Sequence, residues 1–147
     1  MHHVAIMKKE LGFTAKILDR IKTIESRWYS NKSAPWNTIK NGDTIYFKDS
    51  GCLVTVRAEV SKILQFADLS PVKVKNILDA YGTSIGITKK DTRMFFRNFK
   101  DKRYCILIFL KNPTAIKPFA IDKSGFGAMS AWIAVGDISN IRRPDSK

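Results

Sequence analysis

An alternating pattern in residues 52–66 constrains the fold of this chain more than any other feature of its sequence. Small apolar side chains occupy every second position, and polar side chains lie between them. The apolar set is Val54, Val56, Ala58 and Val60, and the polar set is Thr55, Arg57, Glu59 and Ser61. Because successive side chains of a strand point to opposite faces of a sheet, this alternation predicts a long strand with one buried face. A turn at residues 49–51 joins it to an apolar segment at 44–48, so we expect a hairpin.

The remaining apolar segments predict further strands and helices around this hairpin. A nearly continuous apolar run at residues 104–110 is typical of a central strand, and shorter strands are expected at 3–7, 22–29 and 131–135. Pro113 and Pro118 are expected to bound an irregular stretch. Five or six strands interrupted by two or three helices indicate the α+β class, with a small mixed β-barrel. No linker or repeat divides the chain, so residues 1–147 are expected to form a single domain.

Three helices are expected between these strands. Residues 8–21 have apolar side chains at helical spacing, namely Leu11, Ala15, Ile17, Leu18 and Ile21. Ser70 and Pro71 are typical of a helix start, and this helix is expected to run to residue 81 and close at Gly82. A shorter helix is predicted at residues 89–99, with Met94, Phe95 and Phe99 inward.

The charge of the chain indicates the kind of partner. Lys and Arg total 26 against 13 Asp and Glu, which gives a net charge of +13 and a pI near 9.9. Such an excess favours polyanionic partners, with nucleic acid first and a membrane surface second, although a solvated surface is the simpler explanation. No apolar run approaches the ~20 residues that span a bilayer, so no membrane partner is expected.

Few residues are suited to a metal, a cofactor or histidine catalysis. The two cysteines, Cys52 and Cys105, lie in separate apolar runs and are expected to be small core residues, which fits a reducing cytoplasm. The only histidines are His2 and His3, which we expect to be exposed or to start a strand. With no phosphate-binding glycine loop and no metal-ligand spacing, neither a cofactor nor a metal is predicted.

The segment 20–27 contains the most informative group of charged residues. It places Lys22, Glu25 and Arg27 directly after the first predicted helix. If the segment is extended, Thr23, Glu25 and Arg27 share one face, and Lys22 can reach the same spot. A carboxylate and a guanidinium at this spacing can hold a polar ligand together. The alternative is a structural ion pair.

Two other segments are candidates for contacts with a ligand. The predicted loop at residues 30–42 is long for a compact domain, and Trp36 at its middle is either a core plug or a stacking platform. The second segment is rich in cations, with phenylalanines between them that either stack on bases or form the buried face of a helix. Its cations are Lys89, Lys90, Arg93, Arg97, Lys100, Lys102, Arg103 and Lys111.

Four segments occur in an order that resembles the activating signal cointegrator homology (ASCH) family, a branch of the PUA-like fold. They are residues 21–27, Pro35-Trp36, residues 42–48 and residues 131–133. The family pattern is Gly-x-Lys-x-x-Glu-x-Arg after the first helix, followed by a Gly-Asp that begins a barrel strand. The resemblance covers nearly the whole chain and is closest to small stand-alone members of archaeal type. Arg20 replaces the leading glycine, which adds a positive charge beside the site.

The resemblance implies a β-barrel flanked by helices, with Lys22, Glu25 and Arg27 lining a cleft for RNA or a nucleotide-like ligand. In this hypothesis Arg27 and Lys22 hold a phosphate or a base carbonyl, while Glu25 accepts from a base amino group or orients Arg27. Side chains expected to stack on a base are Trp36, Tyr46 and Trp28. Lys48 and the cation-rich segment would add nonspecific attraction.

Two alternatives remain open. Similar proteins include a hydrolase of acetylcytidine that uses a lysine, a threonine and a glutamate, and proteins reported as ribonucleases. Lys22 matches that lysine, but Glu25 stands where the hydrolase has threonine. As an enzyme acting on an acylated nucleoside or RNA, the chain would use Lys22 to activate water or Thr23, with Glu25 as general acid and base. The other alternative is a protein-interaction adaptor, which would have a large exposed apolar patch.

Overall fold

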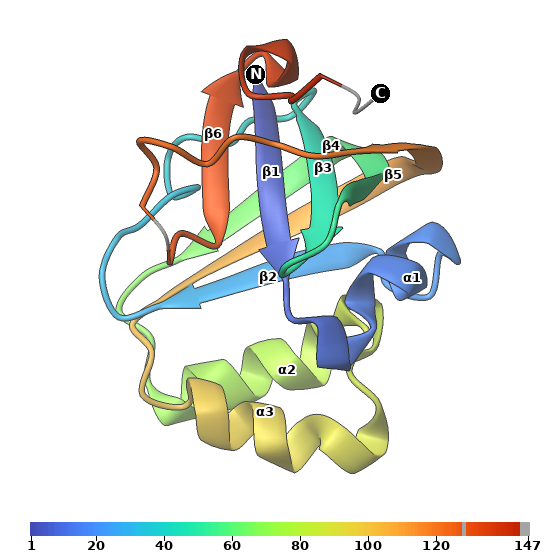
Figure 1. The fold of residues 1–147 in the computed structure, drawn as a ribbon. Helices are drawn as coiled ribbons and strands as arrows, with labels where there is room; N and C mark the ends of the chain where they lie inside the picture. Colours follow the sequence, from blue (N-terminus) through green and yellow to red (C-terminus); the bar gives the residue numbers. More distant parts are fainter. Residues whose placement is uncertain (128, 145–147) are drawn as a thin grey trace.

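The computed structural model describes residues 1–127 and 129–144, and its main element is a curled six-stranded half-barrel (Figure 1). The strands are β1 (His2–Met7), β2 (Ile24–Tyr29), β3 (Thr44–Asp49), β4 (Val54–Phe66), β5 (Tyr104–Phe119) and β6 (Trp132–Gly136). Their order in the sheet is β2-β5-β4-β3-β1-β6, with β1 and β3 parallel and the other neighbours antiparallel. With the three α-helices, this architecture confirms the predicted α+β class, and the mixed sheet is curled into a small half-barrel.

The helices gather at one end of the half-barrel. They are α1 (Phe13–Leu18), α2 (Pro71–Ile85) and α3 (Thr92–Phe99), with the short 3-10 helices η1 (Lys9–Leu11) and η2 (Lys89–Asp91). A third 3-10 helix, η3 (Ile138–Asn140), lies at the opposite end, beside the N-terminus (Figure 1). In Figure 1, α2 and α3 lie side by side below the sheet, next to β2. Trp28 of β2 stacks on Phe99 of α3, with ring centroids 4.6 Å apart. One face of β2 therefore packs on the helices, and the other face is turned toward the inside of the half-barrel.

Two apolar clusters lie on opposite faces of the sheet. The larger cluster fills the half-barrel and the space under the helices, and it includes Ala5 and Phe47. The smaller cluster joins Val4 and Tyr46 to Phe119, Ile133 and Ile141. Because Val4 and Ala5 are neighbours on β1, they point to opposite faces, so β1 is buried on both sides.

The predicted hairpin is confirmed, but the strand that follows the helices is longer than expected. β3 and β4 pair antiparallel, and Val54, Val56, Ala58 and Val60 of β4 are buried as predicted. In contrast, β5 continues through Pro113 and Pro118, where an irregular stretch was expected. Both prolines lie where the register between β4 and β5 shifts. Since a shifted register leaves ladder positions unpaired, proline is tolerated there without an N–H to donate.

The first helix is shorter than predicted. Gly12 has a left-handed φ of +65° and separates η1 from α1. The helix therefore buries Phe13 and Ile17, whereas Leu18 and Ile21 are 37% and 60% exposed. The prediction that residues 8–21 form one helix with a single apolar face is wrong. The break at Gly12 rotates the following turn, so the apolar side chains before and after it do not share a face.

The other two helices also differ from the prediction. α2 passes through Gly82 and ends at Ile85, where Gly86 adopts a φ of +99°. A glycine inside a helix costs about 1 kcal/mol relative to alanine, which packing of the apolar face of α2 offsets. Phe95 of α3 is buried and Phe99 packs against the core as predicted, but Met94 is 41% exposed.

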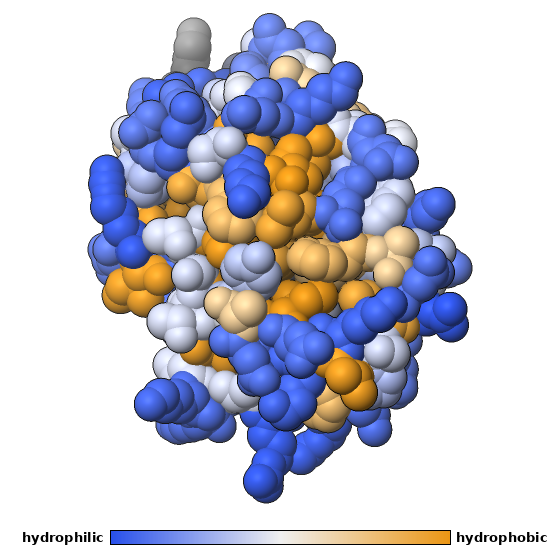
Figure 2. Space-filling model, turned by 180° about the vertical axis from the view of Figure 1, so that it is seen from behind, coloured by the Kyte–Doolittle hydropathy of each residue, from blue (hydrophilic) through white to orange (hydrophobic). Residues whose placement is uncertain are grey.

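The surface opposite to the view of Figure 1 combines apolar and charged areas. Figure 2 shows apolar residues gathered near the centre of this face, with hydrophilic residues around them. Among the described residues, no helix is both long enough and apolar enough to cross a membrane.

Candidate functional site

Lys22 lies at the entrance of β2 and is buried, with 1% of its surface exposed. Its ammonium group donates to the backbone oxygens of Ile24 and Ile85 at 2.7 and 2.6 Å, and its third contact is to Glu25 Oε1 at 3.1 Å. The ring of Phe13 lies on another side, with its centroid 4.5 Å from Nζ. Burial lowers the pKa of Lys22, and the charge of Glu25 opposes this shift. All three N–H groups of the Lys22 ammonium therefore have partners within the protein.

Glu25 is the centre of this charged group. Its carboxylate is buried, with Oε1 beside Lys22 and Oε2 2.9 Å from Arg27 Nη2. Burial alone would raise the pKa of Glu25, but the two cations outweigh this effect and hold the pKa below its usual value. Glu25 is therefore ionised at neutral pH and fixes the positions of both cations.

Arg27 connects the two end strands of the half-barrel. Its Nη1 donates to the backbone oxygen of Ala131, just before β6, at 3.2 Å. Its Nη2 lies 3.4 Å from the backbone oxygen of Ile6 and 3.3 Å from Sδ of Met7, both on β1. We call the side where β2 and β6 face each other without a backbone ladder the seam. Arg27 spans the seam by side-chain contacts instead.

The guanidinium of Arg27 is the part of the charged group that reaches solvent. Its side chain is 13% exposed, against 0% for Lys22 and 4% for Glu25. The indole of Trp132 lies beside it, with the ring centroid 5.1 Å from Cζ. Nη1 donates to the backbone oxygen of Ala131, and the guanidinium also interacts with the hydroxyl of Tyr29, where it opposes the rise that burial causes in the pKa of Tyr29. The exposed part of the guanidinium is the place in this charged group where an oxygen of a ligand can accept a hydrogen bond.

Three aromatic side chains continue the surface from Arg27. Tyr29 is two residues along β2 and therefore on the same face, and its register partner on β5 is Tyr104. The ring of Trp36 packs edge-on against Tyr104, with centroids 5.2 Å apart. All three are half-buried, and Lys32 lies about 6 Å from the rings of Trp36 and Tyr104. We call Tyr29, Tyr104 and Trp36 the aromatic strip.

Comparison with known proteins identifies the fold. No family model matches this sequence, and no curated protein matches it. In structure it is similar to an ASCH protein from Zymomonas mobilis, at 17% identity and a TM-score of 0.64, over 91% of this chain and 87% of that chain. A point mutant of that protein gives a TM-score of 0.66 at 16% identity, over 95% and 93% of the two chains. A second mutant gives 0.65 at 17% identity, over 95% and 91%. The chain has the ASCH fold.

Within the ASCH fold, the predicted site residues separate into two groups. Lys22, Glu25 and Arg27 are in contact, and Trp36 joins them through the aromatic strip. Tyr46 and Lys48 alternate with the inward-facing Phe47 on β3, so they lie on the opposite face of the sheet. Tyr46 is buried in the smaller apolar cluster, against Phe119. Burial and the nearby Lys123 lower the pKa of Lys48.

The stacking candidates have different environments. Trp28 is buried against Phe99 and donates from Nε1 to Ser26 Oγ at 2.9 Å, so its ring has no free face. Trp36 packs partly on the core. Its indole N–H is buried and has no hydrogen-bond acceptor among the described residues. Thr23 is exposed before the start of β2, and its backbone hydrogen-bonds to Ser84 and Leu110.

The cation-rich segment lies on the helices, behind β2 as seen from Arg27. We call its cations on η2, α3 and the following turn the basic surface: Lys89, Lys90, Arg93, Arg97, Lys100, Lys102 and Arg103. Its members are exposed, apart from the half-buried Lys102. Phe95, Phe96 and Phe99 point toward the core rather than outward. The phenylalanines are therefore the packing face of α3.

A buried histidine lies behind Trp132. His2 and His3 start β1, one of the two positions expected for them, but His3 is fully buried there, and its Nε2 lies 2.8 Å from Asp43 Oδ2. Trp132 Nε1 donates to His3 Nδ1 at 3.1 Å, which places the ring proton on Nε2. Burial lowers the pKa of His3 despite the carboxylate, so the ring is neutral at pH 7. This network fixes the indole that flanks Arg27.

Tyr29 and Tyr104 are the site residues that sequence reasoning missed. Tyr29 could have been found from its spacing of two from Arg27 on the same predicted strand. Tyr104 could not, because its position opposite Tyr29 depends on the β2–β5 register. Among the described residues, no group of histidine, cysteine and acidic side chains is arranged to hold a metal ion.

Proposed function

We propose that this protein is an RNA- or nucleotide-binding module whose ligand lies along the aromatic strip beside Arg27. The observation that carries the proposal is the continuity of a partly exposed guanidinium with Tyr29, Tyr104 and Trp36 on one face of the sheet. Aromatic rings stack on bases of any sequence, and a guanidinium donates to phosphate or to a base carbonyl. Lys32 adds a positive charge at the far end of the strip.

In this proposal the three charged residues have different roles. Arg27 contacts the ligand through the exposed part of its guanidinium. Glu25 orients the guanidinium through its contacts at 2.9 and 3.2 Å. Lys22 keeps Glu25 ionised from the buried side and does not contact the ligand. This division follows from their exposures, and it narrows the sequence hypothesis, in which all three line the cleft.

The net charge supports a polyanionic ligand. With +13 on 147 residues, the protein attracts nucleic acid over distances comparable to the Debye length of about 10 Å at 0.1 M salt. The basic surface lies on the helices rather than at the seam. It therefore contributes to the rate of encounter and to nonspecific affinity, whereas the aromatic strip contributes to the complex itself.

The two alternatives have less support. A hydrolase would need Lys22 as base or nucleophile, but its ammonium already donates to Ile24, Ile85 and Glu25. A protein-interaction adaptor would use the apolar area visible in Figure 2, but this area does not explain the excess of cations. Nucleic-acid binding, in contrast, accounts for both the positive net charge and the aromatic strip.

Fluorescence anisotropy with a labelled single-stranded RNA tests the proposal. The dissociation constant should rise steeply with salt, with a log–log slope of about 0.7 per phosphate contacted. Arg27→Ala should weaken binding about tenfold or more, as expected for a lost charge-assisted contact.

The matched control is Arg57→Ala, which removes the same charge from an exposed position on β4. Arg57→Ala should weaken binding by less than about twofold. Equal effects of the two substitutions, or binding that does not depend on salt, would reject the proposed site.

A further inference from the structure

Arg20 has a backbone conformation that arginine seldom adopts. It follows the end of α1 with a φ of +63°, in the left-handed region that favours glycine. Its N–H donates to the backbone oxygen of Ile17 at 3.1 Å, and Ile21 donates to Lys16 at 2.9 Å, so the turn closes the helix. Glycine would form the same turn without strain. An arginine therefore occupies a position whose backbone conformation favours glycine.

No hydrogen bond or ion pair of the Arg20 side chain with the described residues offsets this strain. The residue is exposed, and its guanidinium has no partner among the described residues, although Asp19 is adjacent. A structural arginine normally pairs its donors with carboxylates or carbonyl oxygens. The unpaired guanidinium is thus available to a ligand.

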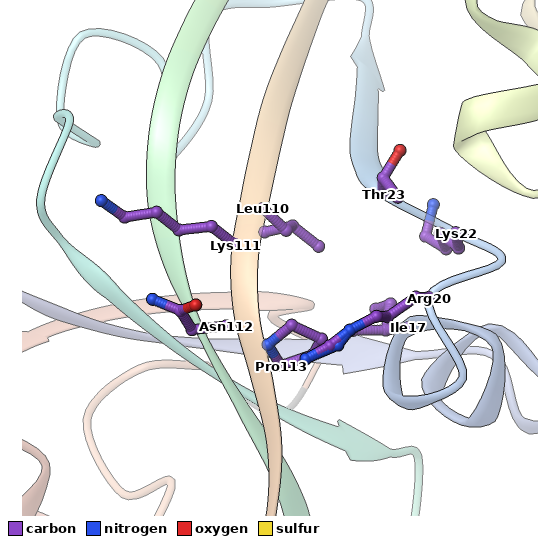
Figure 3. Close-up of a pocket in the computed structure, with 8 residues that line it drawn as sticks. All are labelled: Ile17, Arg20, Lys22, Thr23, Leu110, Lys111, Asn112 and Pro113. Carbon is purple, nitrogen blue, oxygen red and sulfur yellow. The ribbon is translucent and has the colours of Figure 1, made fainter.

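Arg20 borders a pocket of about 240 Å³ between α1, the entrance of β2 and the middle of β5 (Figure 3). Ile17, Leu110 and Pro113 supply apolar walls. In Figure 3, Arg20 extends from the end of α1 toward Pro113, and Leu110 points into the same space. Lys111 and Asn112 extend to the other side of the β5 ribbon. The pocket is thus an apolar space with one guanidinium at its edge.

The volume of this pocket and the charges around it indicate the size and the charge of a molecule that fits. Its volume is below the range of about 300–1,000 Å³ that holds drug-sized molecules, so it fits one ring with a small substituent. No acidic residue is among the described residues that line it. Of its three cations, Lys22 is already paired with Glu25 and Lys111 extends to the other side of β5, which leaves Arg20 to meet an anion. Glu25, the acidic residue behind Lys22, is already paired with two cations.

We propose that this pocket binds a flat ring carrying one phosphate or carboxylate group, with the ring against Leu110 and Pro113 and the anion on Arg20. Two sources have this chemistry: a free small molecule, such as a nucleoside monophosphate, or the 5′-phosphorylated end of an RNA. The pocket lies at the start of β2 and the aromatic strip at its end. Seven residues, 23–29, separate them by roughly 20 Å at 3.3 Å per residue. The inference therefore goes beyond the proposed function and does not depend on it.

Backbone amide NMR shifts with phenyl phosphate as the probe test this inference. Saturable shifts are expected at residues 17–23 and 110–112, and phenol, which has the ring without the anion, should bind at least tenfold more weakly. Arg20→Gly should weaken phenyl phosphate binding about tenfold or more, while its melting temperature stays equal or rises because the backbone strain is removed. Arg20→Lys should retain part of the affinity.

Controls separate this site from the aromatic strip. Arg57→Ala should leave phenyl phosphate binding unchanged, and Arg20→Gly should affect RNA affinity no more than Arg57→Ala if the ligand is a free molecule. Shifts of the same amides by a 5′-phosphorylated oligonucleotide, but not by its 5′-hydroxyl form, would assign the RNA end as the source.

The inference is overturned by either of two results. One is the absence of saturable shifts around the pocket with phenyl phosphate. The other is unchanged binding in Arg20→Gly, or a lower melting temperature of that variant, which would make Arg20 a structural residue.

Discussion

Lys22 illustrates how one residue can be essential to the fold while resembling a catalytic group. Its ammonium is sealed among Ile24, Ile85 and Glu25 and lies next to the ring of Phe13. A lysine placed in this way stabilises the C-terminal end of α2, where unpaired backbone oxygens carry partial negative charge. It also neutralises Glu25. Its contribution is therefore to stability first, and to ligand binding only through Arg27.

Removing this ammonium should destabilise the protein strongly. Lys22→Met leaves Glu25 buried with only one cation, and breaking a buried pair costs about 3–5 kcal/mol in the free energy of unfolding. The matched control is Lys75→Met, because Lys75 pairs with Asp79 at 2.8 Å on the exposed face of α2. That substitution should change stability by about 0.5 kcal/mol or less. Urea denaturation of both variants measures the difference, and similar losses would contradict the account.

A second buried residue predicts how stability changes with pH. Burial keeps the pKa of His3 in the folded protein below the value of 6.5 for an exposed histidine. Between the two pKa values the unfolded chain binds a proton that the folded protein does not, so stability should fall as the pH decreases below about 6.5. Urea denaturation between pH 8 and pH 5 measures this slope. His3→Gln should flatten it, and a parent protein whose stability rises toward pH 5 would contradict the assignment.

At the scale of elements, Gly86 shows how helix and strand are held together. It ends α2 with a φ of +99°, next to the buried stem of Lys22. A Cβ at this position would lie 3.3 Å from Cβ of Lys22 and 3.4 Å from the ring of Phe13. The close approach of α2 to the entrance of β2 therefore depends on a residue without a side chain.

Gly86→Ala should accordingly lower the free energy of unfolding by more than backbone strain alone would. Gly42 provides the control, since it has a φ of +91° but no atom within 4 Å of an added Cβ. We expect Gly42→Ala to lower the free energy of unfolding by about 1 kcal/mol and Gly86→Ala by about 2–3 kcal/mol. Thermal or chemical denaturation of the pair isolates the packing contribution. Equal losses would mean that α2 can move away from Lys22 without cost.

The elements also show what the sequence could and could not predict. The alternation at 54–60 and the Ser70-Pro71 helix start depend on local chemistry, and both predictions are confirmed. The ends of β5 and α2 were missed because register shifts at Pro113 and Pro118, and packing around Gly82, are tertiary effects. Likewise, proximity along β2 predicted the contact of Glu25 with Arg27. The separation of Tyr46 and Lys48 from them required the strand order.

At the scale of the whole molecule, the basic, aromatic and apolar areas lie on different parts of the surface. The basic surface covers the helices, the aromatic strip lies at the end of β2, and the apolar area of Figure 2 lies on the face opposite to the view of Figure 1. Long-range attraction and specific contact are thus assigned to different parts of the fold. If the aromatic strip is the binding site, cations on α3 affect how fast RNA arrives more than how it is held.

An NMR titration with single-stranded RNA tests this assignment most directly. The side-chain Nε–H signal of Arg27 and the indole N–H signal of Trp36 report on the site, and the backbone amides of residues 92–100 report on the basic surface. The account predicts that the Arg27 and Trp36 signals and the amides of Tyr29 and Tyr104 shift together and saturate, and that these shifts persist at 0.3 M salt. Shifts confined to residues 89–103 that disappear at that salt concentration would show that RNA binds only the basic surface, and would contradict the proposed site.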